Sequence, residues 1–308
     1  MTPKRKFSHF GYIHIYHITV DRGVCFYSVA DCLVWFTMLC ILAVKYEVQI
    51  LAVCIMLNHF HLEAKFSSMK KMSKMMQELD SWFTRAYNKE HGRKGPLFDG
   101  KYGSAVKLKE QRIRENFIYI CNNPVVKKAV AKASDYRWNF LKYMVSANPF
   151  SRRTPVKSRS RALRCVLAEV EISCQQRRPV GYQFFRGLYG RLAAEEKKQV
   201  IDAIISRYNV IDYQVISKNW GGYERMCQTL STAWGAEHDL EDDNTIEDYR
   251  RYYKMIRMDG EMGVDLARGC PERRISELAW AFRDKVGATK KEIEKLLHCP
   301  VLELYGIQ

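Results

Sequence analysis

The sequence predicts an α+β fold: a ferredoxin-like split β-α-β antiparallel sheet with helices on one face, plus a mainly α-helical C-terminal region. Two observations predict the sheet, namely short segments of alternating apolar and polar residues and long segments of helical spacing between them. Along the chain they give the order β-α-β-β-α-β-α, which matches the split β-α-β arrangement. The third observation is the helical pattern that continues after Cys165.

The first elements of the predicted sheet lie within residues 11–66. Residues 11–20 alternate as a strand, and the apolar residues 30–44 indicate a buried helix. The β-branched run at 48–56 is typical of a central strand. Leu57 and Asn58 interrupt this run, and a second alternating segment at 59–66 predicts the next strand.

The remaining elements of the sheet follow in residues 69–126. An amphipathic helix is predicted by apolar residues at helical spacing, namely Met69, Met72, Met76, Leu79, Phe83 and Ala86. Residues 92–103 are a turn-rich loop, residues 104–108 a short strand, and a further helix begins at about Lys109. We expect two helices to cover one face of the sheet, so that the other face stays available to nucleic acid.

The 308-residue chain is strongly basic, with a net charge of +16 and a pI near 9.4. Polyanions are the usual partners of such proteins. Residues 1–150 hold 23 Lys and Arg against 11 Asp and Glu, and residues 151–308 hold 27 against 23, so the net charges are +12 and +4. We predict a basic first domain over residues 1–148, a basic linker at 149–164 and a helical region at 165–308.

Neither a membrane span nor an export signal is expected from the sequence. The most apolar run, residues 33–44, is twelve residues long, whereas a spanning helix needs about 20. We interpret it as a core helix, and no apolar block follows the N-terminal basic residues. The ten cysteines contain no C-x-x-C pair, so they are expected as small buried side chains in a reducing compartment.

The C-terminal residues 275–306 have the pattern of a helix-turn-helix. A helical segment at 275–286 ends at Gly287, and Thr289 with Glu292 forms a capping box that opens a helix at 290–297. Such a unit could read duplex DNA. The third helix would span only residues 301–305, which is short for a recognition helix, so ordinary helical packing is an equal alternative.

Two histidines give the first indication of chemistry. His59 and His61 flank Phe60 in a predicted strand, so both imidazoles point to one face while Phe60 points to the core. We place both rings on the solvent side, where they would form half of a metal site. Paired surface histidines without a metal are the alternative, and the motif alone does not exclude it.

A tyrosine and an asparagine on the helix after Lys109 are candidates for the rest of the site. Tyr119 and Asn123 lie one turn apart and off the apolar stripe, and an amide oxygen can bind a hard cation. Alternatively, Tyr119 lies at the rim with its hydroxyl in water, and Asn123 caps a new helix that starts with Pro124. Helical spacing leaves these readings open.

Together, three motifs resemble the single-tyrosine HUH transposases, and within them the REP-associated tyrosine transposases. They are residues 56–62 (Met-Leu-Asn-His-Phe-His-Leu), 95–102 (Gly-Pro-Leu-Phe-Asp-Gly-Lys-Tyr) and 119–125 (Tyr-Ile-Cys-Asn-Asn-Pro-Val). Residues 135–139 resemble the aromatic end of the family's domain. The resemblance covers roughly residues 10–145 and identifies residues 1–148 as the catalytic domain.

This resemblance implies a role for each candidate residue. Tyr119 is the nucleophile, His59 and His61 are metal ligands, and Asn123 takes the position of the third ligand for Mg²⁺ or Mn²⁺. His14 and His17 have opposite strand parity, so at most one faces the site, and both are interpreted as core histidines. Five basic residues are candidates for DNA phosphate contacts, namely Arg93, Lys94, Lys101, Lys127 and Lys128.

The implied activity is cleavage and rejoining of single-stranded DNA at hairpin-associated sites through a 5′-phosphotyrosine intermediate. Cleavage would leave a free 3′-hydroxyl, and rejoining would need no ATP. The expected partner is single-stranded DNA with a hairpin, such as a REP-like sequence or a transposon end, in a cytoplasmic, nucleoid-associated location. A DNA-binding regulator without catalysis and a replication-initiator or relaxase-type HUH endonuclease are the alternatives, and a homodimer and a monomer both stay open.

Overall fold

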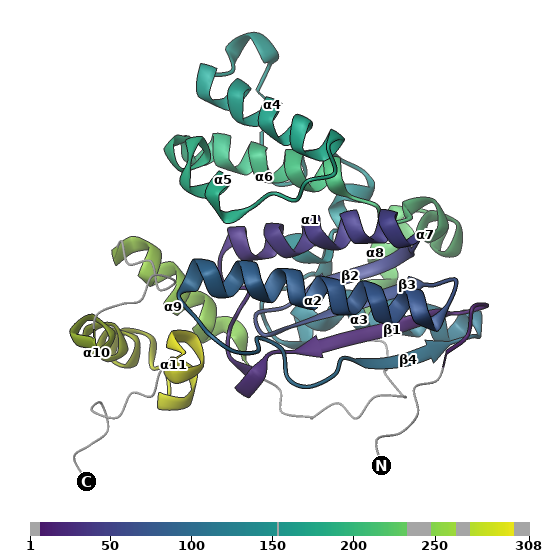
Figure 1. Cartoon of the computed structure of the whole chain (residues 1–308), viewed down its shortest axis with the longest axis horizontal. Helices are drawn as coiled ribbons and strands as arrows, with labels where there is room; N and C mark the ends of the chain where they lie inside the picture. The colour runs from purple at the N-terminus through teal and green to yellow at the C-terminus, as the bar shows by residue number, and fades with distance from the viewer. Residues whose placement is uncertain (1–6, 153, 233–247, 263–271, 299–308) are drawn as a thin grey trace.

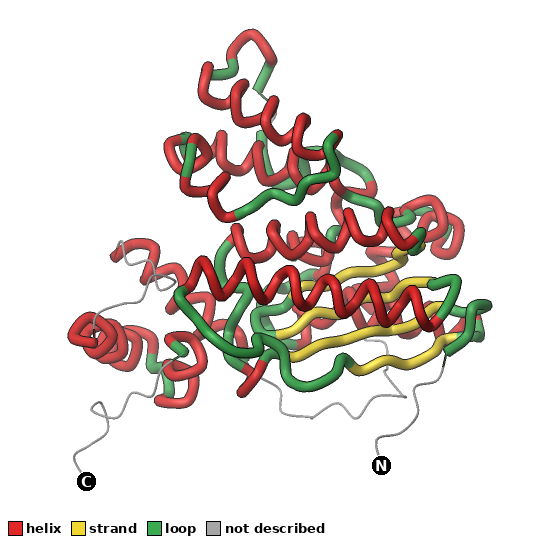
Figure 2. The backbone as a smooth tube through the Cα atoms, viewed as in Figure 1, coloured by secondary structure: helices red, strands yellow, loops and turns green. Residues whose placement is uncertain are grey.

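A four-stranded antiparallel sheet lies at the centre of the computed structural model, which describes residues 7–152, 154–232, 248–262 and 272–298. Its strands are β1 (Tyr12–Ile18), β2 (Gln49–Ile55), β3 (His59–Lys65) and β4 (Gly103–Lys107). They are hydrogen-bonded in the order β2-β3-β1-β4, which is the ferredoxin-like order. The predicted α+β fold is therefore confirmed (Figure 2).

Helices α1 (Val29–Tyr46) and α2 (Met69–His91) cover one face of the sheet, as predicted. The apolar side chains of β3 point toward them, and the ring centroids of Phe60 and Trp35 lie 4.5 Å apart. Ser28 and Asp31 form a capping box that fixes the first turn of α1. The two helices also pack against each other (Figure 1).

By length and composition alone, α1 could cross a membrane. In the structure it packs against α2, against β2 and against α6 (Ala194–Tyr208). Most of its residues are buried, among them Leu33, Trp35 and Leu39. Burial of this kind is what we expect of the core helix predicted from the sequence.

The other face of the sheet is covered by α3 (Glu110–Val126), so the prediction of an open face is wrong. This helix contacts β2, β3 and β4, and it buries Phe117 and Ile120. Apolar side chains on this helix gain more by covering the sheet than by facing water. The helix also continues through Pro124, which excludes the reading of Asn123 as the cap of a new helix.

The rest of the described chain is helical, as predicted. Its α-helices are α4 (Arg161–Gln175), α5 (Tyr182–Arg186), α6, α7 (Tyr213–Trp220), α8 (Tyr223–Thr232), α9 (Tyr249–Met262), α10 (Glu272–Ala281) and α11 (Lys290–Leu297). Figure 1 shows α4, α5 and α6 above α1, and α9, α10 and α11 together at one end of the sheet.

Buried contacts join these helices to the sheet domain. The Tyr182 hydroxyl donates to Asp31 in α1 at 2.8 Å, and the backbone N–H of Asp212 donates to the carbonyl of Ile50 in β2 at 2.9 Å. The division into residues 1–148, 149–164 and 165–308 stays a prediction about the sequence. In the structure, the described helices after residue 164 share one apolar core with the sheet.

Asp202 in α6 is a fully buried carboxylate that gathers donors from residues 137–151. Its oxygens accept from the Tyr143 hydroxyl at 2.6 Å, the Ser151 hydroxyl at 2.7 Å and the Phe150 N–H at 3.1 Å. The Arg137 guanidinium forms an ion pair with the same carboxylate. The carboxylate therefore joins the predicted linker to the helical region.

We expect Asp202→Ala to lower the free energy of unfolding by about 3 kcal/mol, because it leaves Arg137 without its buried counter-charge. Urea denaturation followed by circular dichroism measures the change. Glu195→Ala is the control, since this exposed carboxylate accepts a hydrogen bond from the Arg152 N–H. Equal losses from both variants would contradict a special role for Asp202.

The predicted helix-turn-helix is described only in part. Helix α10, a π-helical turn (Phe282–Val286) and α11 follow one another, with Gly287 in the left-handed region at φ 67°. Thr289 and Glu292 form the predicted capping box. Residues 301–305, expected as the third helix, lie outside the described residues, so a role in DNA recognition stays a prediction.

Candidate active site

Strand β3 brings His59 and His61 to the sheet face that α3 covers. Their ring centroids lie 4.9 Å apart, while the intervening Phe60 points to the opposite face and is fully buried. Because side chains alternate along a strand, both rings point to the same face of the sheet, as expected. The expectation that both rings lie on the solvent side is wrong, because α3 covers this face and His61 is only 3% exposed.

Helix α3 places Tyr119 and Asn123 next to these rings. The Asn123 amide Nδ2 lies 3.2 Å from His61 Nε2. The Tyr119 ring stands edge-on to His61, with 5.5 Å between the ring centroids. The four side chains that the sequence analysis selected for catalysis and metal binding therefore come together in space.

His14 belongs to the same cluster, which the sequence analysis missed. Its Nε2 lies 3.0 Å from His61 Nδ1, and its ring centroid is 5.9 Å from that of Tyr119. Strand parity predicted that at most one of His14 and His17 faces the site, but the pattern could not say which one. For His14, the interpretation as a core histidine is therefore incomplete, because this buried ring contacts the candidate metal ligand.

His17 lies on the opposite face of the sheet, where the interpretation as a core histidine is confirmed. Its ring stacks on Phe98 with 4.7 Å between the centroids. Its Nδ1 lies 3.2 Å from the Asp80 carboxylate, and its Nε2 is 3.3 Å from the Asp99 carbonyl. The side chain is 4% exposed, and strand alternation places it on the face opposite that of His14 and the His59–His61 pair.

Hydrogen bonds determine which ring nitrogen carries the proton in His59 and in His61. The Asn58 amide oxygen lies 2.8 Å from His59 Nδ1, and because an amide oxygen only accepts, Nδ1 carries the proton. The Asn123 amide N–H donates to His61 Nε2, so the proton of His61 is on Nδ1 and is donated to His14. Both rings therefore present an unprotonated Nε2, the form that binds a metal ion.

The surroundings of the two histidines favour their neutral form. Burial, together with the positive charges of Lys127 and Arg22 and against the opposing effect of Asn123, lowers the pKa of His59 to about 3. Burial also lowers the pKa of His61 well below its ordinary value, with contributions from His59 and His14. Both imidazoles are neutral at neutral pH and can bind a cation without first losing a proton.

The donor atoms fit a divalent cation with mixed nitrogen and oxygen ligands. The Asn123 Oδ1 atom is buried and accepts no hydrogen bond from the residues that the structure describes. Rotation of this amide would exchange Oδ1 with Nδ2 beside His61. In the part of the chain that the structure describes, no group of three or more His, Cys, Asp or Glu side chains is placed to hold a metal. The Asn123 amide oxygen stays the predicted third ligand.

The five predicted DNA-contacting residues lie on two segments, the loop between α2 and β4 and the residues that follow α3. Lys127 follows α3, and its charge acts on both His59 and His61. Lys128 pairs with Asp248 at 3.5 Å, and Arg93 donates to Asn88 at the end of α2. Lys94 and Lys101 are exposed in the loop before β4. Arg22, which the sequence analysis did not select, also places positive charge near His59.

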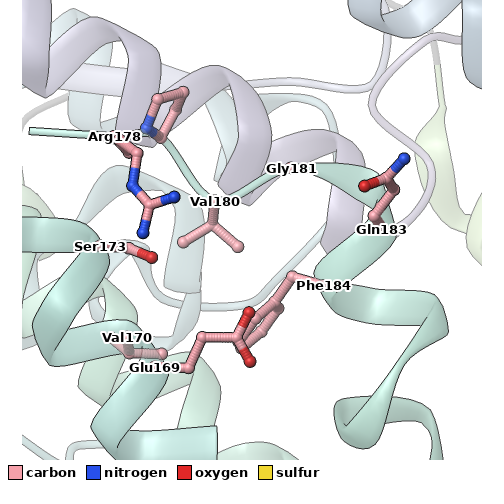
Figure 3. Close-up of a pocket in the computed structure, with 9 residues that line it drawn as sticks. Glu169, Val170, Ser173, Arg178, Val180, Gly181, Gln183 and Phe184 are labelled. Atoms are coloured by element: carbon pink, nitrogen blue, oxygen red, sulfur yellow. The ribbon is translucent and has the colours of Figure 1, made fainter.

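A pocket between α4 and α5 lies apart from these residues. Its lining includes Glu169, Arg178, Val180 and Phe184, which Figure 3 shows around the opening. No residue of the predicted site lines it. The pocket is therefore not part of the candidate active site.

The region that carries the site matches a known class of proteins. Residues 9–123 match the model of a family described as "Transposase IS200 like". This range includes His14, His59, His61 and Tyr119, and it ends at Asn123. The resemblance to a transposase family that the three motifs predicted is therefore confirmed for this part of the chain. No curated protein matches the chain.

One solved structure is also similar, and its title is "Structure of the REP associates tyrosine transposase bound to a REP hairpin". The two chains are 15% identical, and the TM-score is 0.42. The aligned part covers 52% of this chain and 96% of the other.

Proposed function

We propose that this chain is a metal-dependent single-strand DNA transposase that cleaves and rejoins DNA at hairpin-associated sites. The observation that carries the proposal is the convergence of Tyr119 from α3 with His59 and His61 from β3. Asn123, one turn after Tyr119, supplies the third candidate ligand. A phenol hydroxyl beside unprotonated imidazoles is an arrangement suited to nucleophilic attack on a phosphodiester.

In the proposed reaction, the Tyr119 oxygen attacks the scissile phosphorus and its proton passes to solvent. The bond from phosphorus to the 3′-oxygen breaks, which leaves a 5′-phosphotyrosine and a 3′-oxygen that takes up a proton. Rejoining is the reverse attack by a 3′-hydroxyl, so no ATP is consumed. Held by His59, His61 and Asn123, Mg²⁺ or Mn²⁺ would neutralise charge on the scissile phosphate. The packing of Tyr119 against His61 and His14 holds the nucleophile in place.

The test of this function is the formation of a covalent protein–DNA adduct by the wild-type protein. Labelled single-stranded DNA from the flanks of its own gene is incubated with Mg²⁺, Mn²⁺ or a chelator, then resolved on a denaturing gel. We expect an adduct with metal and none with chelator, and the labelled peptide should lie within residues 113–127. The absence of an adduct with both ions would contradict the proposal and favour a DNA-binding regulator.

Lys127 should contribute a phosphate contact to DNA binding. We expect Lys127→Gln to weaken binding of single-stranded hairpin DNA and to reduce the slope of log affinity against log salt by about 0.7, the value for one phosphate contact. Fluorescence anisotropy at several salt concentrations measures both quantities. Lys128→Gln is the control, because Lys128 is already paired with Asp248. An unchanged slope in Lys127→Gln would remove this residue from the interface.

A further inference from the structure

Tyr249, the first residue of α9, reaches the candidate metal site from the helical region. Its hydroxyl donates to the Asn58 amide oxygen at 2.8 Å, and its backbone N–H donates to the Lys127 carbonyl at 3.0 Å. The side chain is 1% exposed. This residue lies outside the range 9–123 that matches the transposase family.

The same Asn58 oxygen accepts the hydrogen bond from His59 Nδ1. On the other side of the amide, Asn58 Nδ2 donates to the Arg22 carbonyl at 3.1 Å. If the amide turned over, its Nδ2 group would face the N–H of His59 and the Tyr249 hydroxyl, and its oxygen would face the Arg22 carbonyl, which can only accept. The hydroxyl of Tyr249 and the carbonyl of Arg22 therefore hold Asn58 together in the orientation that keeps the proton of His59 on Nδ1.

The backbone of Tyr249 contacts the residue that follows α3, the helix that carries Tyr119 and Asn123. Lys127, which accepts its N–H, directly follows α3 and lies four residues after Asn123. Next to it, Asp248 pairs with Lys128 at 3.5 Å. Asp248 and Tyr249, at the start of α9, therefore connect the end of α3 to Asn58, the residue before His59.

We propose that Tyr249 is a positioning residue for the metal site: through Asn58 it fixes His59 with Nε2 free for a divalent cation. The inference rests on the proposed function, because it assigns His59 as a ligand. It adds that the site is incomplete without the helical region, although the three motifs all lie before residue 126. Outer hydrogen bonds of this kind orient metal-binding histidines in many proteins.

The test measures Mn²⁺ binding to the full chain without DNA, by electron paramagnetic resonance titration. We expect Tyr249→Phe to weaken Mn²⁺ binding about tenfold, the lower end of the range for lost outer hydrogen bonds. Tyr253→Phe is the matched control: it lies on the same helix, and its buried hydroxyl pairs with Tyr136 at 3.2 Å. This control should bind Mn²⁺ as the wild type does. Equal affinity in Tyr249→Phe and the wild type would overturn the inference.

A second variant separates positioning from general loss of packing. Adding Asn58→Asp to Tyr249→Phe supplies a carboxylate, which can only accept and so holds His59 Nδ1–H without help from the tyrosine. We expect the double variant to recover Mn²⁺ affinity to within about threefold of the wild type. Affinity that stays at the level of Tyr249→Phe would contradict positioning through Asn58.

Failure of the proposed function would look different. If wild-type protein bound no Mn²⁺, or if His61→Ala bound it as tightly as the wild type, the metal site itself would be wrong. Should Tyr249→Phe not fold, proton–nitrogen NMR of the wild-type histidines still decides the inference. We expect His59 to carry its proton on Nδ1, and a proton on Nε2 instead would overturn the positioning role.

Discussion

Tyr119→Phe should abolish the covalent protein–DNA adduct and lower strand cleavage by at least about a thousandfold, as loss of a nucleophile does in other enzymes. The change removes one oxygen and keeps the ring that packs edge-on to His61 and His14. Folding and DNA binding should therefore stay close to those of the wild type. Adduct formation on a denaturing gel and anisotropy with hairpin DNA measure the two effects separately.

The control for this variant is Tyr12→Phe, which removes a hydroxyl that bonds to Gln49 on the same sheet. Tyr12 begins β1 and its hydroxyl bonds to Gln49 of β2 rather than to His59, His61 or Asn123, so the variant should form the adduct normally. An adduct that persists in Tyr119→Phe would move the nucleophile to another residue. Loss of DNA binding together with the adduct would instead indicate a structural role for Tyr119.

The second large effect is expected from the loss of both candidate ligands. Replacement of His59 and His61 by Ala should reduce metal-dependent cleavage at least about a hundredfold, because a bound cation stabilises transition-state charge by several kcal/mol. Since His61 is buried and bonded to His14 and Asn123, the variant should also unfold more easily. Cleavage rates are therefore measured well below the melting temperature determined by circular dichroism.

His17→Ala provides the matched control for the double variant. It removes a histidine that is as buried as His61 from the other face of the same sheet, where its Nδ1 lies 3.2 Å from the Asp80 carboxylate. We expect His17→Ala to lose stability but to keep metal-dependent cleavage per folded molecule. Wild-type cleavage by the His59 and His61 double variant would show that the metal lies elsewhere.

Local patterns were sufficient to predict the sheet and its two covering helices. Alternation in residues 59–66 predicted both β3 and the shared face of His59 and His61. Helical spacing placed Tyr119 and Asn123 one turn apart, and α3 carries them that way in the structure. These features depend on residues that are neighbours in the sequence, so the sequence alone carries them.

The features that were missed depend on contacts between distant segments. Alternation separates His14 from His17 but cannot say which strand face α3 will cover. Helical spacing showed that the helix after Lys109 has an apolar stripe, yet nothing local showed that this helix covers the second face of the sheet. Nor does any motif connect Tyr249 with Asn58, because that hydrogen bond spans 191 residues.

The separation of 191 residues between Asn58 and Tyr249 affects when the site becomes ordered during synthesis. The hydrogen bond between Tyr249 and Asn58 forms only after residue 249 has left the ribosome, which at roughly 5–20 residues per second is about 10–40 s after Asn58 is synthesised. Until then, a nascent chain that already contains Tyr119, His59 and His61 lacks the contact that orients His59. The site therefore becomes fully ordered only after most of the polypeptide has been translated.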